Sequence, residues 1–231
     1  MARRASLLAD WTLGRRSLAR NDRIAAVKRS KGLFIVFEGP DKSGKSTQAR
    51  LLAAALRARN VDILHTREPG GTSVAEGVRR VLLDPALCID PLAELFLYEA
   101  SRAQHTNELI LPALKAGKVV ICERFTMSTD AYQGAARGLG VKTTTVLNRI
   151  ATSGLKADLT ILLDIPVAEF DTRDQGRELD RLERENKDFR LKVRKGYLKA
   201  AQADPRAIVL DGKLPPDVLQ AKIIALVDKK L

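Results

Sequence analysis

The sequence predicts an α/β fold: a three-layer α/β/α domain with a five-stranded parallel sheet as its middle layer. Short apolar runs recur along the chain and helical segments separate them, which is the alternation that builds a parallel sheet covered by helices on both faces. The chain also has 231 residues, of which 45% are hydrophobic, so it is long enough for one large domain with a full core and short for two.

Strands are expected at five apolar runs. LFIVFE at residues 33–38 is apolar without alternation, as in a strand that is buried on both faces. The other four runs are also short and mainly apolar. The predicted strands are residues 33–38, 61–66, 118–122, 158–165 and 207–212.

Helices are expected between these strands. Asp90 and Pro91 form a good N-cap and first-turn pair for the longest helix that precedes the third strand, and Pro112 is placed to kink its second half. The predicted helices are residues 45–59, 73–83, 91–117, 127–137, 142–153, 178–203 and the segment after Pro216.

Residues 1–31 read as a basic extension to a domain that comprises residues 32–231. The extension holds nine Lys or Arg against two Asp, which accounts for +7 of the formal net charge of +12. We expect it to be disordered or loosely helical, and the roles of partner-binding arm, targeting segment and mis-called start all stay open. The remaining +5 suits a domain whose ligands are phosphates. The sequence has no apolar run near the roughly 18–20 residues of a membrane span.

The two cysteines, Cys88 and Cys122, each lie in an apolar stretch. This count predicts neither a disulfide framework nor a zinc site. We expect two buried thiols in a reducing compartment.

The segment 39–46 fits the phosphate-binding pattern G-x-x-x-x-G-K-[ST] without deviation, after an apolar strand and at the start of a helix. Its glycines let backbone N–H groups turn toward phosphate oxygens, and the helix N-terminus favours negative charge. We expect Lys45 to reach the β- and γ-phosphates and Ser46 to ligate Mg²⁺ through its hydroxyl. The residues predicted to bind the triphosphate are Gly39, Pro40, Asp41, Lys42, Ser43, Gly44, Lys45, Ser46 and Thr47.

Four further segments follow this loop along the chain. They are HTREPGGT at 65–72, ELFLYEASRAQH at 94–105, CERFTMSTDAYQG at 122–134 and DRLERENKDFRLKVRKGYLKAA at 180–201. Together with FEGPDKSGKST at 37–47 they resemble the bacterial thymidylate kinases, a family of P-loop nucleoside monophosphate kinases, over essentially all of residues 32–231. A single segment such as REPGG is weak evidence for this family, whereas the set of five segments is specific to it.

The resemblance implies a P-loop kinase fold with a short lid at about residues 170–180. It implies a cytoplasmic enzyme that phosphorylates dTMP to dTDP with ATP and Mg²⁺. It also implies a homodimer formed through helices near the second and third strands, with neither a membrane nor a nucleic acid as a partner of the core domain.

The resemblance also implies which residues meet the acceptor phosphate and sugar. Arg67 matches the arginine that holds the dTMP phosphate, and a guanidinium at a strand end can fork onto a monophosphate. Arg124 matches the arginine between the acceptor and donor phosphates. Asp41 matches the loop acid that meets the sugar 3′-hydroxyl, and Tyr132 matches the tyrosine that crowds a ribose 2′-hydroxyl, which implies a preference for deoxyribose.

For the base, the resemblance points to one face of a helix. Tyr98 and Arg102, spaced i, i+4, match the aromatic that stacks on thymine and the arginine that hydrogen-bonds its edge. Phe96 is then expected in the core. The residues implied at the dTMP site are Asp41, Arg67, Tyr98, Arg102, Arg124, Ser128, Thr129, Tyr132 and Gln133.

Phosphoryl transfer needs in-line placement and cations near the developing charge, with little covalent chemistry from the protein, so no histidine is required. The resemblance implies Lys45 and Arg124 in this role. Family members take a further cation from the phosphate loop or from the lid. This chain offers Lys42 in the loop and both Arg173 and Arg177 in the lid, and the sequence leaves the choice open.

Glu123 stands where the family usually has aspartate, at a strand end where a carboxylate can hold Mg²⁺ or its waters. The extra methylene leaves open whether it contacts the metal directly. The residues expected at the metal are Ser46 and Glu123.

Three alternatives remain on the sequence alone. One is a kinase of another deoxynucleoside monophosphate or of a broader range of them. Another is a nucleic-acid-associated P-loop ATPase anchored by the basic extension, although aromatic residues make up only 4% and interleaved basic–aromatic patches are missing from the sequence. The third is a nucleotide binder without turnover, which the Glu-for-Asp change at residue 123 would permit.

Overall fold

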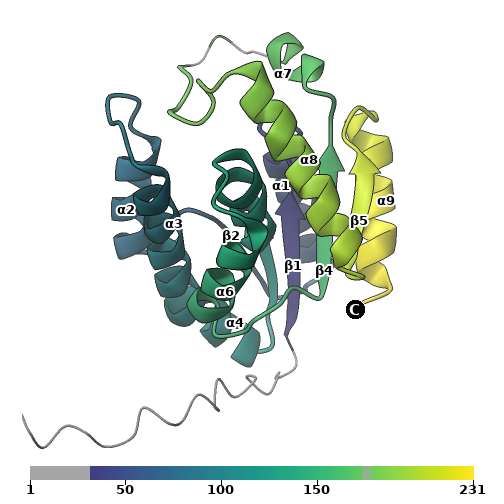
Figure 1. Cartoon of the computed structure of the whole chain (residues 1–231). Helices are drawn as coiled ribbons and strands as arrows, with labels where there is room; N and C mark the ends of the chain where they lie inside the picture. Colours follow the sequence, from purple (N-terminus) through teal and green to yellow (C-terminus); the bar gives the residue numbers. More distant parts are fainter. Residues whose placement is uncertain (1–31, 174–175, 177) are drawn as a thin grey trace, which may run out of the picture.

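The computed structural model describes residues 32–173, 176 and 178–231, so the extension predicted at residues 1–31 lies outside the described residues. A five-stranded parallel sheet forms the centre of the fold, with the strand order β2-β3-β1-β4-β5 (Figure 1). This confirms the predicted fold class. The strands are β1 (Leu33–Glu38), β2 (Ile63–Arg67), β3 (Val119–Glu123), β4 (Leu159–Asp164) and β5 (Ala207–Asp211).

Helices cover both faces of the sheet and give three layers (Figure 1). On one face α1 and α9 contact the strands through Leu52, Leu56 and Ile223. On the other face Phe34 and Val120 contact η1 and α4. The helices, with π-helical turns written η, are α1 (Lys45–Ala58), α2 (Ser73–Leu83), α3 (Pro91–His105), η1 (Thr106–Ile110), α4 (Leu111–Lys115), α5 (Thr126–Thr129), η2 (Asp130–Ala136), α6 (Val141–Ala151), α7 (Ala168–Thr172), α8 (Lys187–Ala203) and α9 (Pro216–Asp228).

At one point, the helices α8 and η2 approach each other more closely than a side chain at residue 196 would allow. Gly196 of α8 faces Ala131 of η2, and a Cβ at residue 196 would come within 2.8 Å of the Ala131 Cα atom. The missing side chain therefore lets the two backbones touch. This contact brings Tyr197 beside Tyr132, with their ring centroids 6.1 Å apart.

The helix predicted over 178–203 is wrong in its first part, because α8 begins only at Lys187. The Asp180 carboxylate accepts from the backbone N–H groups two and three residues later, both at 2.9 Å, and turns the chain there. Asn186 then caps α8 by accepting from the Phe189 N–H at 2.9 Å.

The helix predicted over 91–117 is interrupted by the π-helical turn η1, where the Leu111 N–H donates to the Thr106 carbonyl. The wider turn ends two residues before Pro112, which lacks an N–H and whose ring would clash with a carbonyl in a regular helix. The proline therefore changes the hydrogen-bond pattern of this segment. The helix predicted over 127–137 is also π-helical in its second part, over Asp130–Ala136. The short helix α7 was not predicted from the sequence.

Two smaller findings concern the thiols and the membrane. Cys122 is buried as expected, whereas Cys88 is exposed, so the prediction for Cys88 is wrong. Within the described ranges, no helix combines the length and the apolar character needed to cross a bilayer.

The strand register brings the predicted site residues to one edge of the sheet. Phe37 of β1 lies opposite Glu123 of β3, and Glu123 lies opposite Arg67 of β2. The loops that follow these strands therefore start side by side. Ligands of open parallel sheets bind at this carboxyl edge.

Candidate active site

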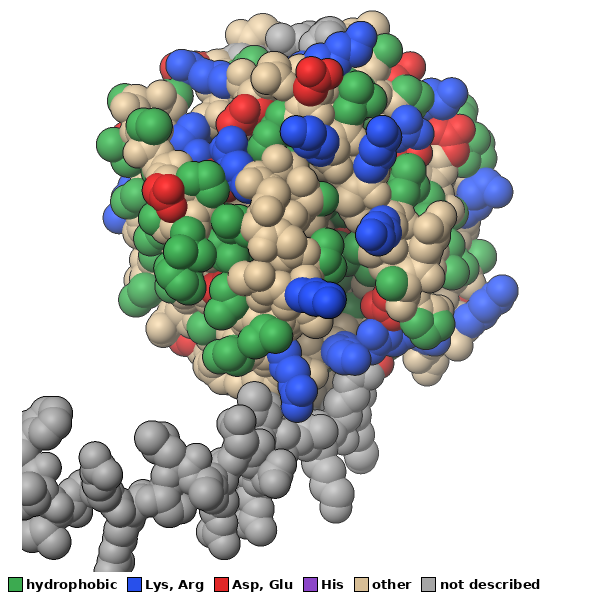
Figure 2. All heavy atoms as spheres, viewed as in Figure 1, with side chains coloured by type: hydrophobic (Ala, Val, Ile, Leu, Met, Phe, Trp, Pro, Cys, Tyr) green, Lys and Arg blue, Asp and Glu red, His purple; other side chains and the backbone are tan. Residues whose placement is uncertain are grey.

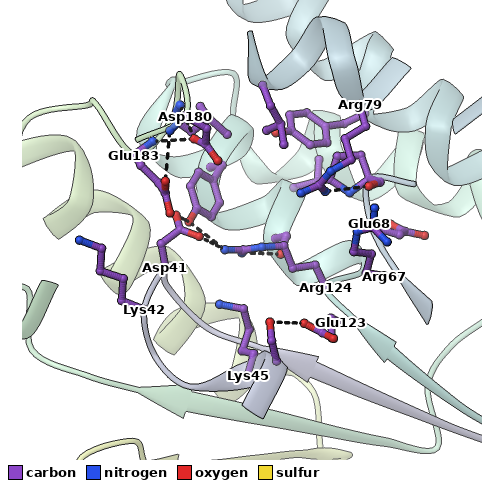
Figure 3. A pocket seen from close by; sticks show the side chains of 18 of the residues that line it. Asp41, Lys42, Lys45, Arg67, Glu68, Arg79, Glu123, Arg124, Asp180 and Glu183 are labelled. Carbon is purple, nitrogen blue, oxygen red and sulfur yellow. Dashed lines mark hydrogen bonds and ion pairs between the residues drawn. The ribbon is translucent and has the colours of Figure 1, made fainter. Parts of the chain in front are cut away.

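A cavity of about 830 Å³ lies at the carboxyl edge of the sheet (Figure 3). It is bordered by most of the residues predicted for the site, namely Asp41, Lys42, Gly44, Lys45, Ser46, Thr47, Arg67, Tyr98, Glu123, Arg124, Ser128, Thr129, Tyr132, Gln133 and Arg173. Gly39, Pro40, Ser43 and Arg102 are not among its lining residues. Arg177 lies outside the described residues.

The phosphate loop turns through backbone conformations that glycine favours. Gly39 has a φ of 139°, and a Cβ there would come 2.4 Å from the Leu163 carbonyl oxygen. Gly44 has a φ of 94° and precedes α1 without a side-chain cap, so the first N–H groups of this helix are directed at whatever occupies the loop. The loop thus has the form of an anion site.

Lys45 is buried within this loop. Its ammonium donates to the Pro40 carbonyl at 2.7 Å and lies 3.4 Å from the Ser43 hydroxyl. Burial lowers the pKa of Lys45 to about 7, and the positive charge of Arg124 adds to this effect. A phosphate group placed in the loop would stabilise the charged ammonium.

Arg124 joins the end of β3 to the phosphate loop. Its guanidinium donates to the Asp41 carboxylate, to the Gly39 carbonyl at 3.2 Å and to the Tyr197 hydroxyl at 2.7 Å. The Tyr132 hydroxyl donates to the second oxygen of Asp41 at 2.7 Å. Burial alone would raise the pKa of Asp41, but the Arg124 charge, with help from Lys45, holds it below its usual value. Asp41 is therefore an ionised acceptor that faces the cavity.

Glu38 is a buried residue of the site that the sequence analysis missed. Its Oε1 accepts from the backbone N–H groups of Phe125 at 2.8 Å and Ser128 at 3.2 Å, and its Oε2 accepts from the Ser128 hydroxyl at 2.6 Å. Burial raises the pKa of Glu38, and these hydrogen bonds counter it only in part. A charged residue at the end of an apolar strand, directly before the phosphate loop, is the signal that could have identified it.

Ser46 and Glu123 meet at the mouth of the loop. The Ser46 hydroxyl donates to Glu123 Oε2, and the His65 Nε2 lies 2.9 Å from Glu123 Oε1. Burial alone would raise the pKa of Glu123, but its hydrogen bonds with His65 and Ser46 hold it below its usual value. A hydroxyl and an ionised carboxylate are the hard oxygen donors that Mg²⁺ prefers, so the two residues fit such an ion.

Two arginines border the side of the cavity away from Lys42 and Lys45 (Figure 3). Arg67 is half-exposed and donates to both oxygens of Glu76, at 3.0 and 3.1 Å. Arg79, which the sequence analysis missed, donates to the Pro69 carbonyl at 2.9 Å. Burial, and then the neighbouring Arg67 charge, lowers the pKa of Arg79.

Of the two residues predicted to bind the base, Tyr98 and Arg102, only one borders the cavity. Tyr98 borders the cavity, whereas Arg102 is 1% exposed and lies behind the cavity wall. Arg102 contacts Thr129, which does border the cavity, so it braces the wall. Its acceptors lie on Glu68 (2.8 Å), Glu99 (2.9 Å), Thr129 (2.7 Å), Asn148 (2.8 Å) and the Phe125 carbonyl (3.0 Å). Phe96, expected in the core, is 53% exposed instead.

Two of the predicted additional cations, Lys42 of the phosphate loop and Arg173, lie next to each other. The Lys42 ammonium lies 4.0 Å from the ring centroid of Phe170 in α7, and the Arg190 guanidinium lies 3.9 Å from that centroid. Arg173 donates to the Lys42 carbonyl at 3.2 Å and to the Gly212 carbonyl at 3.1 Å. The segment at 168–173 is thereby tied to the phosphate loop.

Comparison with known proteins identifies the family. The family model described as thymidylate kinase matches residues 37–223. The chain is 47% identical to the thymidylate kinase of Thermoanaerobacter sp. (strain X514) over 202 residues, which cover 87% of this chain and 100% of the relative. It is 45% identical to the thymidylate kinase of Deinococcus radiodurans over 203 residues, covering 87% and 98%.

A solved structure agrees with these relatives. The crystal structure of thymidylate kinase from Ehrlichia chaffeensis matches with a TM-score of 0.71 and 32% identity, covering 86% of this chain and 99% of that one. The cavity, the phosphate loop and these similarities lead to one conclusion. The chain belongs to the thymidylate kinase family.

Proposed function

We propose that this chain transfers the γ-phosphoryl group of ATP to dTMP and releases ADP and dTDP. The observation that carries this function is the position of Asp41. It lies in the loop expected to hold ATP, yet its carboxylate is bound by Arg124 and Tyr132, which border the cavity beyond that loop. This one loop residue thus links the loop proposed to hold ATP with the residues proposed to hold dTMP.

An ADP-release assay tests the proposal. Purified chain is given ATP with dTMP, dUMP, dCMP or dGMP in turn, and kcat/KM is compared. We expect dTMP to be the best acceptor, and Lys45→Met to remove turnover because the phosphates lose their buried cation. A better rate with another monophosphate would move the assignment to that substrate.

We assign the donor side to the phosphate loop. The residues proposed to bind ATP are Gly39, Pro40, Asp41, Lys42, Ser43, Gly44, Lys45, Ser46 and Thr47. Ser46 and Glu123 are proposed to hold Mg²⁺, which supplies positive charge to the β- and γ-phosphate oxygens when it is bound. His65 orients Glu123 from the neighbouring strand.

We assign the acceptor side to the opposite part of the cavity. Arg67 and Arg124 are proposed to hold the dTMP phosphate, because guanidinium groups bind phosphate oxygens in pairs. Tyr98 offers a ring for stacking on the base. The residues proposed to bind dTMP are Asp41, Arg67, Tyr98, Arg124, Ser128, Thr129, Tyr132 and Gln133, and Arg102 is proposed to hold Thr129 in place from behind the wall.

The transferring phosphoryl is proposed to be stabilised by Lys45 and Arg124. Lys42 and Arg173 are the described candidates for the additional cation, and both border the cavity. Arg177 remains a candidate from the sequence alone. A nucleic-acid-stimulated ATPase receives no support from the described site.

We further propose that the enzyme is a cytoplasmic homodimer, with residues 32–231 as its kinase domain. Exposed apolar side chains support the dimer, and Figure 2 shows hydrophobic side chains gathered over the side where α2 and α3 lie. On α2, α3 and α6 these exposed residues are Val74, Val81, Leu92, Phe96, Val146 and Ile150. Light scattering during gel filtration tests this, since Phe96→Glu should convert a dimer to a monomer.

A further inference from the structure

Glu94 is a buried carboxylate beside the cavity that has no part in the proposed phosphoryl transfer. It lies in the first turn of α3 and is 0% exposed. Its Oε1 accepts from Gln133 Nε2 at 2.7 Å and from Arg137 Nε at 3.3 Å. Its Oε2 accepts from Arg137 Nη2 at 3.2 Å and from Arg181 Nη1 at 2.6 Å. Each oxygen thus receives two donors, which fills the roughly four acceptor sites of an ionised carboxylate.

The two arginines around Glu94 are themselves held in place. Arg137 also pairs with Glu185 at 2.6 Å and lies over the Phe189 ring at 4.6 Å. Arg181 donates through Nε to the carbonyl of residue 82 at 2.9 Å. Because Gln133, Arg137 and Arg181 all donate to it, the Glu94 carboxylate acts here only as an acceptor.

This arrangement decides how the Gln133 amide is turned. An ionised carboxylate only accepts hydrogen bonds, so the amide nitrogen of Gln133 must face Glu94. The opposite orientation would place the amide oxygen against a carboxylate oxygen, and two acceptors repel each other. Gln133 is 1% exposed and borders the cavity, and with its nitrogen turned to Glu94 its amide oxygen is the one acceptor that its side chain can offer a ligand.

We propose that Glu94 is a positioning residue that fixes the amide of Gln133 and thereby makes the site select bases that carry an imino N–H. Thymine and uracil have this donor at ring position 3, whereas cytosine has a lone pair there. With cytosine, the Gln133 amide oxygen would face the lone pair at ring position 3. Two buried acceptors that face each other reduce the favourable free energy of binding by at least as much as the loss of one hydrogen bond. The inference rests on the proposed function, since it concerns the base of the acceptor.

The substitution Glu94→Gln tests the inference in the full chain. A neutral amide at residue 94 can donate as well as accept, so Gln133 is free to turn its nitrogen toward the base. We expect the ratio of kcat/KM for dTMP to that for dCMP to fall about tenfold or more. The ratio for dTMP to dUMP should stay within about twofold, because both bases carry the imino donor. Ratios between substrates do not depend on the fraction of folded enzyme.

Two further variants distinguish a turned Gln133 amide from a general weakening of the packing around Glu94. Arg137→Gln removes charge from the same cluster but leaves the Glu94–Gln133 hydrogen bond, so it should keep the dTMP to dCMP ratio. In the double variant with Gln133→Leu, Glu94→Gln should not change the dTMP to dCMP ratio any further, because residue 133 then has no amide to orient.

Three results would overturn the inference: an unchanged dTMP to dCMP ratio in Glu94→Gln, an equal loss in Arg137→Gln, or a wild-type ratio in Gln133→Leu. Failure of the proposed function is a different result, because the wild-type chain would then not phosphorylate dTMP best. If the wild-type chain prefers dTMP and the Glu94→Gln variant keeps the same dTMP to dCMP ratio, the inference about Glu94 is wrong while the proposed function still holds.

Discussion

Arg124 and Asp41 form an ion pair that connects the end of β3 with the phosphate loop. Arg124 adopts a φ of 67°, which is uncommon for a residue with a side chain. Its backbone N–H donates to the Phe37 carbonyl at 2.8 Å, which helps to hold this conformation. The guanidinium is thus held between the phosphate loop and the end of β3, at the border of the proposed donor and acceptor parts of the cavity.

The substitution Asp41→Asn should lower kcat/KM for dTMP about 100-fold, because the site loses an ionised acceptor and Arg124 loses its partner. ATP should bind at least as tightly as before, since a negative charge near its phosphates is removed. Steady-state kinetics and calorimetric ATP titration measure the two effects. Asp228→Asn, which breaks an exposed pair with Arg59, is the control. An Asp41→Asn activity within threefold of wild type would contradict the role of Asp41.

ATP binding should take up a proton at Lys45. With its pKa near 7, Lys45 is largely neutral at pH 8 in the free enzyme, and the triphosphate charge should raise this pKa. Affinity should therefore fall as the pH rises above 7, and proton uptake should grow toward about one per ATP.

Calorimetry in buffers with different ionisation enthalpies measures this uptake. Lys45→Arg is the control, because a guanidinium stays charged and takes up no proton. Equal uptake by wild type and Lys45→Arg at pH 8 would show that Lys45 does not titrate on binding.

The two described candidate cations should differ in the kinetic constant that they affect. Lys42→Met should lower kcat about 10- to 100-fold, because Lys42 belongs to the loop that surrounds the phosphates. Arg173→Met should mainly raise KM for ATP, because Arg173 ties α7 to the loop and to Gly212 through backbone carbonyls. Initial-rate kinetics separate the two constants. The opposite pattern would assign the catalytic cation to Arg173.

Asp130 should make the stability of the chain depend on pH. Burial raises its pKa to about 6 from an ordinary 3.8, although the hydrogen bond from Thr144 acts against this. The folded chain then binds more protons than the unfolded chain between pH 4 and 6. The contribution of Asp130 is therefore present below pH 4 and is lost as the pH rises through 6.

Asp130→Asn should gain stability relative to wild type as the pH rises from 4 to 7, by up to about 3 kcal/mol. Urea unfolding at several pH values measures the difference, and Asp217→Asn on the exposed start of α9 is the control. A difference that does not change with pH would mean that Asp130 has an ordinary pKa.

Sequence patterns predicted those parts of the molecule that local chemistry determines. The strand at 33–38 and the loop from Gly39 to Ser46 need only apolar runs and a fixed spacing to be recognised. The turn at Asp180 was missed because a charged run with helical composition hid a side chain that bonds to its own backbone. Local competition of this kind leaves little trace in composition.

The contacts between distant residues were beyond the sequence. Arg102 follows Tyr98 by four residues, so the sequence predicts that both lie on one face of a helix. Arg102 is buried instead because it donates to Glu68 and Asn148, which lie far away along the chain. Glu38 likewise bonds to residues 125 and 128 through the pairing of two strands. Such partners are set by packing, and a single sequence does not list them.

The backbone contact between Gly196 and Ala131 has a mechanical consequence. Because residue 196 has no side chain, the backbone of α8 lies directly against Ala131, and a larger residue at 196 would push on η2 and on its Tyr132, which borders the cavity. The shape of this side of the cavity therefore depends on the absence of a side chain at residue 196.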